Sequence, residues 1–280
     1  MATDQSEGFI DIDGARLEYR RIPATQPDRP TLVFLHEGLG CVAIWKDVPD
    51  RLAAATGCAA LVYSRRGYGN SSPAPLPRPI TYLQYEAERV LPAVLDAFGL
   101  ADVVLVGHSD GASIALLAAA GPLAPRIRLA VAEAPHVLVE DVTVAGIEAV
   151  TDLYRTGPLR ERLKRLHGDN VDNAFWGWSD AWLTPAFRFW NIEDRLPDIR
   201  VPLLVIQGVG DEYATAEQYD SIAARSGGPV SVLVLDDCGH TPHRDQADRV
   251  LAAIAEAVAA AIATAVLPCE AHSRHTLHLD

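Results

Sequence analysis

The chain has 280 residues, of which 49% are hydrophobic and 22% are charged. This composition is ordinary for a globular protein and excludes a disordered or fibrous chain. The 24 Lys and Arg residues are outnumbered by 37 Asp and Glu residues, which gives a formal net charge of −13. Because such a surface repels phosphate backbones and anionic headgroups, we expect no nucleic acid and no membrane among the partners.

The ends of the chain carry no targeting signal that we can identify. The first residues, MATDQSEGFIDI, lack the basic region and apolar stretch of a secretory signal, so we expect a cytoplasmic protein. The longest apolar segment, residues 253–267, is Ala-rich and shorter than the roughly 20 residues of a membrane span. The cysteines form no CxxC pair and are predicted to be free thiols. They are Cys41, Cys58, Cys238 and Cys269.

Strand and helix patterns alternate along the chain. Residues 8–22 place two alternating segments around Asp13-Gly14, which predicts a hairpin. Apolar runs without polar alternation then predict strands buried on both faces. They are TLVFLH (31–36), ALVYS (60–64), DVVLVGH (102–108), RLAVAEA (128–134), PLLVIQG (202–208) and VSVLVLD (230–236). Helical patterns lie at 45–56, 81–99, 110–121, 213–226 and 242–265. The order predicts an α/β fold with a mostly parallel central sheet and helices on both faces.

One segment interrupts this alternation. Residues 137–196 have a long helical pattern after the strand at 128–134, and we interpret them as an inserted helical cap. The predicted organisation is therefore a core of residues 1–136 and 197–268, a cap of residues 137–196 and a flexible tail of residues 269–280. The tail carries His272, His275 and His278. We interpret it as a frayed terminus rather than a metal site.

The strongest local motif is Gly107-His108-Ser109-Asp110-Gly111, a G-x-S-x-G sequence between a predicted strand and a predicted helix. A nucleophile on such a sharp turn needs small residues two positions before and two positions after it. The turn also places Ser109 at a helix N-terminus, where free N–H groups favour developing negative charge. The motif predicts that Ser109 is a catalytic nucleophile.

A serine hydroxyl needs a base to remove its proton, and the base needs an acid to orient it. His240 follows the strand 230–236 and is the predicted base, with His243 as a competing candidate. Asp211 follows the strand 202–208 and is the predicted acid. Glu212 is adjacent, and Glu133 ends another core strand, so these two carboxylates remain alternatives. The order serine, acid, histidine is that of α/β-hydrolases.

Together these residues resemble the α/β-hydrolase superfamily over nearly the whole chain, especially its capped carboxylesterases, lactonases, carbon–carbon bond hydrolases and perhydrolases. The segment 65–71, RRGYGNS, looks like the family's R-G-x-G-x-S loop. The family usually has His-Gly-x after its first core strand, and the third residue donates an N–H to the oxyanion. Here the sequence is His36-Glu37-Gly38, so the resemblance implies backbone donors at Gly38 and Asp110, with Glu37 in place of the usual glycine.

The cap contains a dense aromatic cluster. Four of the five tryptophans in the chain fall between residues 175 and 190 and are candidates for the substrate pocket: Trp176, Trp178, Trp182 and Trp190. Such rings either line a pocket or anchor a cap to the core, and the sequence leaves both interpretations open.

These features predict a serine hydrolase that cleaves a carboxylic ester of a small, largely apolar substrate through an acyl-enzyme. We expect no metal, no organic cofactor and a monomer or homodimer. Two alternatives remain. One is a carbon–carbon bond hydrolase or lactonase acting on a ring-cleavage product, and the other is a ligand-binding receptor that keeps the fold without turnover.

Overall fold

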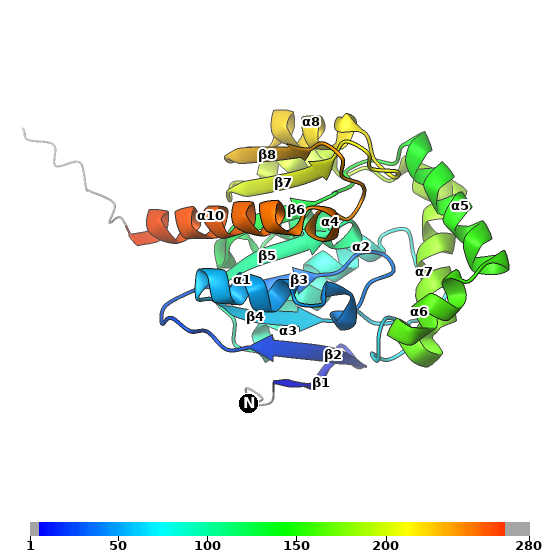
Figure 1. Cartoon of the computed structure of the whole chain (residues 1–280), viewed down its shortest axis with the longest axis horizontal. Helices are drawn as coiled ribbons and strands as arrows, with labels where there is room; N and C mark the ends of the chain where they lie inside the picture. The colour runs from blue at the N-terminus through cyan, green and yellow to red at the C-terminus, as the bar shows by residue number, and fades with distance from the viewer. Residues whose placement is uncertain (1–5, 267–280) are drawn as a thin grey trace, which may run out of the picture.

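A computed structural model describes residues 6–266, and its strands form one eight-stranded sheet in the order β1-β2-β4-β3-β5-β6-β7-β8 (Figure 1). The strands are β1 (Glu7–Ile12), β2 (Ala15–Ile22), β3 (Thr31–Leu35), β4 (Ala59–Tyr63), β5 (Val103–His108), β6 (Ile127–Glu133), β7 (Leu203–Gly208) and β8 (Val230–Leu235). β2 pairs with β1 and β4 in antiparallel orientation, and every other pairing is parallel. The predicted hairpin and mostly parallel sheet are confirmed.

The helices fall where the sequence pattern predicts them. They are α1 (Val48–Thr56), α2 (Tyr82–Tyr85), α3 (Leu91–Ala97), α4 (Asp110–Ala119), α5 (Asp141–Thr156), α6 (Leu159–His167), α7 (Val171–Leu183), α8 (Ala216–Arg225), α9 (Pro242–Asp245) and α10 (Ala247–Val266). The predicted helix at 81–99 is made of α2, a π-helical segment (Glu86–Val90) and α3. None of the helices in residues 6–266 has both the length and the apolar character that crossing a bilayer requires.

The sheet separates two apolar cores. Successive side chains of a strand point to opposite faces, so in β3 Leu32 and Phe34 pack with α1 and α10, whereas Val33 and Leu35 pack with α3 and α4. Helices therefore cover both faces, as the uninterrupted apolar strands predict (Figure 1).

Helices α5, α6 and α7 lie between β6 and β7 in the chain and stand beyond one end of the sheet (Figure 1). They make up most of residues 137–196, which we continue to call the cap, and the inserted helical region is as predicted. The exact division of core and cap stays a prediction. The tail, with Cys269 and its three histidines, lies outside the described residues. Cys41, Cys58 and Cys238 are free thiols.

The turn from β5 into α4 is packed too tightly for side chains at its glycines. A Cβ on Gly111 would lie 1.9 Å from the Leu35 carbonyl oxygen, and a Cβ on Gly107 would lie 2.3 Å from the Gly111 carbonyl oxygen. Ser109, between them, has a φ of 53°, in a region that non-glycine residues rarely adopt. The close approach of backbone to backbone thus explains the small residues of the motif.

We predict that Gly111→Ala destabilises the protein, because the added methyl group must displace the backbone of β3. Overpacking of this kind costs about 1–3 kcal/mol, which lowers Tm by roughly 2–4 °C for each kcal/mol in a chain of this size. Gly121→Ala is the control, since its Cβ would meet nothing closer than 3.3 Å. Thermal unfolding measures both variants, and equal Tm values would contradict the packing argument.

Candidate active site

Ser109, His240 and Asp211 meet at the carboxyl ends of three parallel strands of the sheet. Ser109 follows β5, Asp211 follows β7, and His240 lies in the loop after β8. The Ser109 Oγ is 2.9 Å from His240 Nε2. The other ring nitrogen of His240, Nδ1, lies 2.8 and 2.9 Å from the two carboxylate oxygens of Asp211. The structure therefore brings together the three side chains that the sequence singled out.

This arrangement determines which ring nitrogen of His240 carries the proton. An ionised Asp211 can only accept, so His240 Nδ1–H donates to it, and His240 Nε2 is left to accept the Ser109 hydroxyl proton. Asp211 also accepts from the Gln207 side chain at 2.5 Å and from the Tyr213 N–H at 2.8 Å. Burial alone would raise the pKa of Asp211, but the hydrogen bond and charge of His240 hold it below its ordinary value. Asp211 is therefore ionised at neutral pH.

The alternative carboxylates have other partners. Glu133 lies in the core, 2.9 Å from His243 Nδ1, and forms a second buried carboxylate–histidine pair. Glu212 accepts from the backbone N–H of His240 at 3.3 Å, whereas the His240 ring hydrogen-bonds to Asp211. His243 lies in α9, where its ring packs 4.8 Å from the ring of Trp45. The Ser109 backbone N–H donates to the Glu133 carbonyl at 2.9 Å, but among the described residues neither the Glu133 carboxylate nor the His243 ring hydrogen-bonds to the Ser109 hydroxyl.

The loop after β3 holds Gly38 beside the serine. Arg65 is buried and donates from its guanidinium to the Glu37 carbonyl at 2.9 Å, and its backbone N–H donates to the His36 ring at 3.1 Å. Asp110 is the first residue of α4, so its N–H has no partner within the helix. Gly38 and Asp110 both line the cavity that contains Ser109. The two predicted oxyanion donors therefore border the same cavity.

Glu37 occupies the position where the family pattern has glycine. Its carboxylate oxygen Oε2 lies 3.6 Å from His108 Nδ1. Burial alone would raise the pKa of Glu37, but its interactions with His108 and His36 lower it to about 2. The opposite nitrogen of His108, Nε2, donates to the His240 carbonyl at 2.6 Å. The extra carboxylate is thus ionised and is linked through His108 to the loop that carries His240.

The side chain of Asp110 connects the core to the cap. Its carboxylate accepts from Tyr82 Oη at 2.6 Å and from the indole N–H of Trp182 at 3.2 Å. Arg65 lies 3.6 Å away, and the Asp110 and Arg65 side chains are each only 1% exposed. A cap tryptophan therefore hydrogen-bonds directly to the residue that follows Ser109. This contact positions α7 over the turn.

The cavity above Ser109 has a volume of about 220 Å³. Two of the four candidate tryptophans, Trp178 and Trp182, line it, and Trp176 and Trp190 do not. Trp176 lies against the ring of Tyr154 at 5.4 Å, and Trp190 stacks on Phe187 at 5.5 Å. The aromatic cluster thus lines the cavity with two rings and packs the cap with the others.

Several lining residues were not singled out from the sequence. They include Leu39, His136, Ile147, Tyr213 and Arg244. His136 follows β6 directly, so the rule that sites form at the carboxyl ends of parallel strands could have identified it. Its ring centroid is 5.8 Å from that of His240. Burial and the nearby His240 lower the pKa of His136 to about 3, so its ring is neutral at physiological pH.

Within residues 6–266, no cluster of three or more His, Cys, Asp or Glu side chains is arranged to hold a metal ion. The His136 ring nitrogen Nδ1 is buried and has no hydrogen-bond partner in this part of the chain. The His136 ring thus borders the cavity in its neutral form.

Comparison with known proteins agrees with this architecture. A model of the Alpha/beta hydrolase family matches residues 32–253. A proline iminopeptidase of Lactobacillus helveticus is 23% identical, and the match covers 85% of this chain and 92% of the relative. An enol-lactonase from Burkholderia xenovorans superposes with a TM-score of 0.65 at 21% identity over 91% of this chain and all of that one. A thermophilic esterase from Thermogutta terrifontis superposes with a TM-score of 0.67 at 19% identity over 92% and 99% of the two chains. At this low sequence identity, the similarity to these solved structures shows that the chain shares their fold.

The Glu133–His243 pair predicts a pH-dependent contribution to stability. Burial alone would lower the pKa of His243, but the charge and hydrogen bond of Glu133 raise it above its ordinary value. Because the pKa of His243 is higher in the folded than in the unfolded state, the pair stabilises the folded protein fully at pH values below the unfolded pKa of about 6.5. This stabilisation is lost as the pH rises through the pKa of the folded state.

We therefore expect Glu133→Gln to lower the free energy of unfolding by up to about 3 kcal/mol at pH 6 and by less at pH 9.5. Urea unfolding at the two pH values measures the difference between the variant and the parent. A difference that stays the same or grows at high pH would rule out a charged pair.

Proposed function

This chain belongs to the alpha/beta hydrolase family, and from that premise we propose that it is a serine hydrolase that cleaves a carboxylic ester of a small substrate. The observation that carries the proposal is the continuous hydrogen-bonded path from Ser109 Oγ through the ring of His240 to Asp211. A serine that hydrogen-bonds to a histidine oriented by a buried carboxylate is the arrangement that activates a hydroxyl as a nucleophile.

In the first half of the reaction, Ser109 Oγ attacks the ester carbonyl carbon while His240 Nε2 takes the hydroxyl proton. The carbonyl oxygen becomes an oxyanion and is stabilised by the N–H groups of Gly38 and Asp110. Asp211 stabilises the imidazolium that forms on His240. The carbon–oxygen bond of the ester then breaks, His240 gives its proton to the leaving alcohol, and an acyl group remains on Ser109.

In the second half, a water molecule donates its proton to His240 Nε2 and attacks the acyl carbon. The oxyanion of this second tetrahedral intermediate accepts hydrogen bonds from the same two N–H groups. Its collapse returns the proton from His240 to Ser109 and releases the carboxylic acid. These steps need no metal and no organic cofactor.

The size and lining of the cavity support a small ester. Its volume of about 220 Å³ lies below the range of about 300–1,000 Å³ that is usual for drug-sized ligands. Leu39, Ile147, Trp178 and Trp182 supply apolar walls for an acyl or alcohol group. An iminopeptidase, a lactonase and an esterase resemble the chain to a similar degree. A panel of test substrates should therefore include lactones and compounds with a cleavable carbon–carbon bond beside simple esters. If none of them is turned over, a ligand-binding receptor is favoured.

We predict that a fluorophosphonate probe labels Ser109, because only a serine activated by a base and an oxyanion site reacts readily. Peptide mapping should place the label on Ser109, and Ser109→Ala should lose it together with hydrolysis of 4-nitrophenyl butyrate. We expect kcat to fall by several orders of magnitude. Ser113→Ala is the matched control, since Ser113 lies in α4 and hydrogen-bonds to the His136 carbonyl. Labelling of Ser109→Ala at the parent rate would refute the assignment.

We predict that Asp211→Asn lowers kcat by roughly 10⁴-fold, the loss known for a neutralised triad aspartate, because an amide no longer fixes the tautomer of His240. Glu212→Gln is the matched control, since its amide oxygen still accepts from the His240 N–H. Glu133→Gln is a second control and should retain most of the activity. Steady-state kinetics on the same ester measures all three. If Glu133→Gln were the severe change and Asp211→Asn the mild one, the orienting acid would be misassigned.

A further inference from the structure

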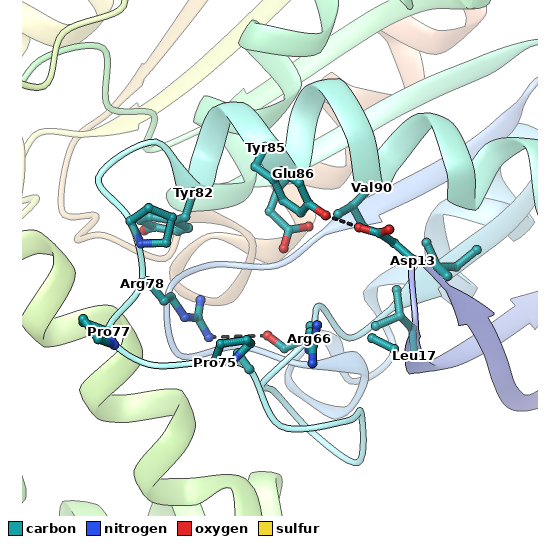
Figure 2. A pocket seen from close by; sticks show the side chains of 14 residues that line it. Asp13, Leu17, Arg66, Pro75, Pro77, Arg78, Tyr82, Tyr85, Glu86 and Val90 are labelled. Carbon is teal, nitrogen blue, oxygen red and sulfur yellow. Dashed lines mark hydrogen bonds between the residues drawn. The ribbon is translucent and has the colours of Figure 1, made fainter.

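A second cavity lies away from Ser109 and has no part in the proposed reaction. It has a volume of about 280 Å³ and is formed by the β1–β2 hairpin, residues 66–79 and the helical stretch from Tyr82 to Val90 (Figure 2). None of the residues that line it also lines the cavity above Ser109. The second cavity is therefore separate from the one above Ser109 and contains none of the side chains of the proposed reaction.

Most of the wall of this second cavity is apolar. Ile12 and Leu17 come from the hairpin, Val90 comes from the π-helical segment, and three prolines (Pro75, Pro77 and Pro79) come from the loop opposite. Figure 2 shows the rings of Tyr82 and Tyr85 on the helical side. Apolar surface in contact with water is unfavourable by roughly 25 cal/mol for each Å², so this lining favours an apolar ligand.

Two side chains of the lining, Glu86 and Arg78, each have a buried polar atom without a hydrogen-bond partner in the described residues. Glu86 extends from the helix toward the loop that carries Arg66 and Arg78 (Figure 2). Its oxygen Oε2 is buried and has no hydrogen-bond partner in the described residues. Burial raises the pKa of Glu86, although the charges of Arg65 and Arg78 oppose the rise. An unpaired buried oxygen is unfavourable, and a ligand that hydrogen-bonds to it removes that cost.

The other charged groups around the cavity have partners, although Arg78 Nε is a buried donor without one in the described residues. Arg78 donates to the Tyr68 hydroxyl at 2.7 Å, and its guanidinium lies 4.4 Å from the centre of the same ring. Arg66 donates to the Pro73 carbonyl at 3.0 Å, and Asp13 accepts from Tyr85. Two cations and two acids thus border the cavity. This balance favours a neutral ligand over an ion of either sign.

A hydroxyl group meets these conditions. It both donates and accepts a hydrogen bond, so it pairs with Glu86 whether that carboxyl group is ionised or protonated, whereas an ammonium only donates and a carboxylate only accepts. We propose that the second cavity is a binding site for a small, neutral, apolar molecule that bears one hydroxyl group, with the hydroxyl on Glu86 and the apolar body against Leu17, Val90 and the prolines.

Isothermal titration calorimetry with matched probes tests the proposal. The probes are 2-phenylethanol, ethylbenzene, which lacks the hydroxyl, and the ions 2-phenylethylammonium and phenylacetate. In the parent protein we expect 2-phenylethanol to bind and both ions to bind more weakly. In Glu86→Leu, which removes the hydrogen-bonding group at similar size, the ratio of the Kd values of ethylbenzene and 2-phenylethanol should fall about 2- to 10-fold, as expected for one hydrogen bond. Retained binding of ethylbenzene shows that this variant is folded.

A second variant tests whether the probes bind in this cavity. Ala74 lines the second cavity and not the first, so Ala74→Phe fills space there alone and should weaken binding of both neutral probes. If neither neutral probe binds the parent protein, there is no such site. If Ala74→Phe leaves both affinities unchanged, the ligand binds elsewhere. An unaltered Kd ratio in Glu86→Leu, or tighter binding of either ion, overturns the assigned chemistry.

Discussion

The sharp turn between β5 and α4 is the constraint on which the rest of this molecule depends. It presses Gly111 against the Leu35 carbonyl of β3, so the loop that follows β3 must pass beside Ser109. The same turn begins α4 at Asp110, which lines the cavity and whose carboxylate accepts hydrogen bonds from Tyr82 and Trp182. One local backbone conformation therefore places Ser109, the loop that carries Gly38 and the contact between core and cap.

Two carboxylate–histidine pairs lie close together but have different environments. Asp211 and His240 lie beside the cavity and share their hydrogen bonds with Ser109, Gln207 and Tyr213. Glu133 is fully buried, and its His243 ring packs against Trp45 rather than against a substrate surface. In the first pair, the ring nitrogen of His240 that points away from Asp211, Nε2, lies 2.9 Å from the Ser109 hydroxyl beside the cavity. The second is enclosed by core side chains, so its contribution is to stability.

The sequence was sufficient for the fold because its strands are uninterrupted apolar runs separated by helical periodicity, and both signals are local. It also singled out Ser109, His240 and Asp211, which the structure brings together, because each follows a core strand in the order that the resemblance implies. What it could not supply depends on contacts between distant segments. Nothing local to Trp176 or Trp190 distinguishes them from Trp178, which reaches Gly38 across the fold. The partner of Glu133, likewise, is 110 residues away along the chain.

The contact between Gly38 and Trp178 bears on how this protein can diverge. A Cβ at position 38 would lie 2.2 Å from the indole ring, so any side chain there collides with the cap while the tryptophan is present. A smaller residue at position 178, by contrast, opens space beside Ser109 and leaves the backbone N–H of Gly38 untouched. The two positions therefore form an ordered evolutionary pair, in which substitution of the tryptophan must precede substitution of the glycine. Selection for bulkier substrates would begin in α7, and the oxyanion loop would follow.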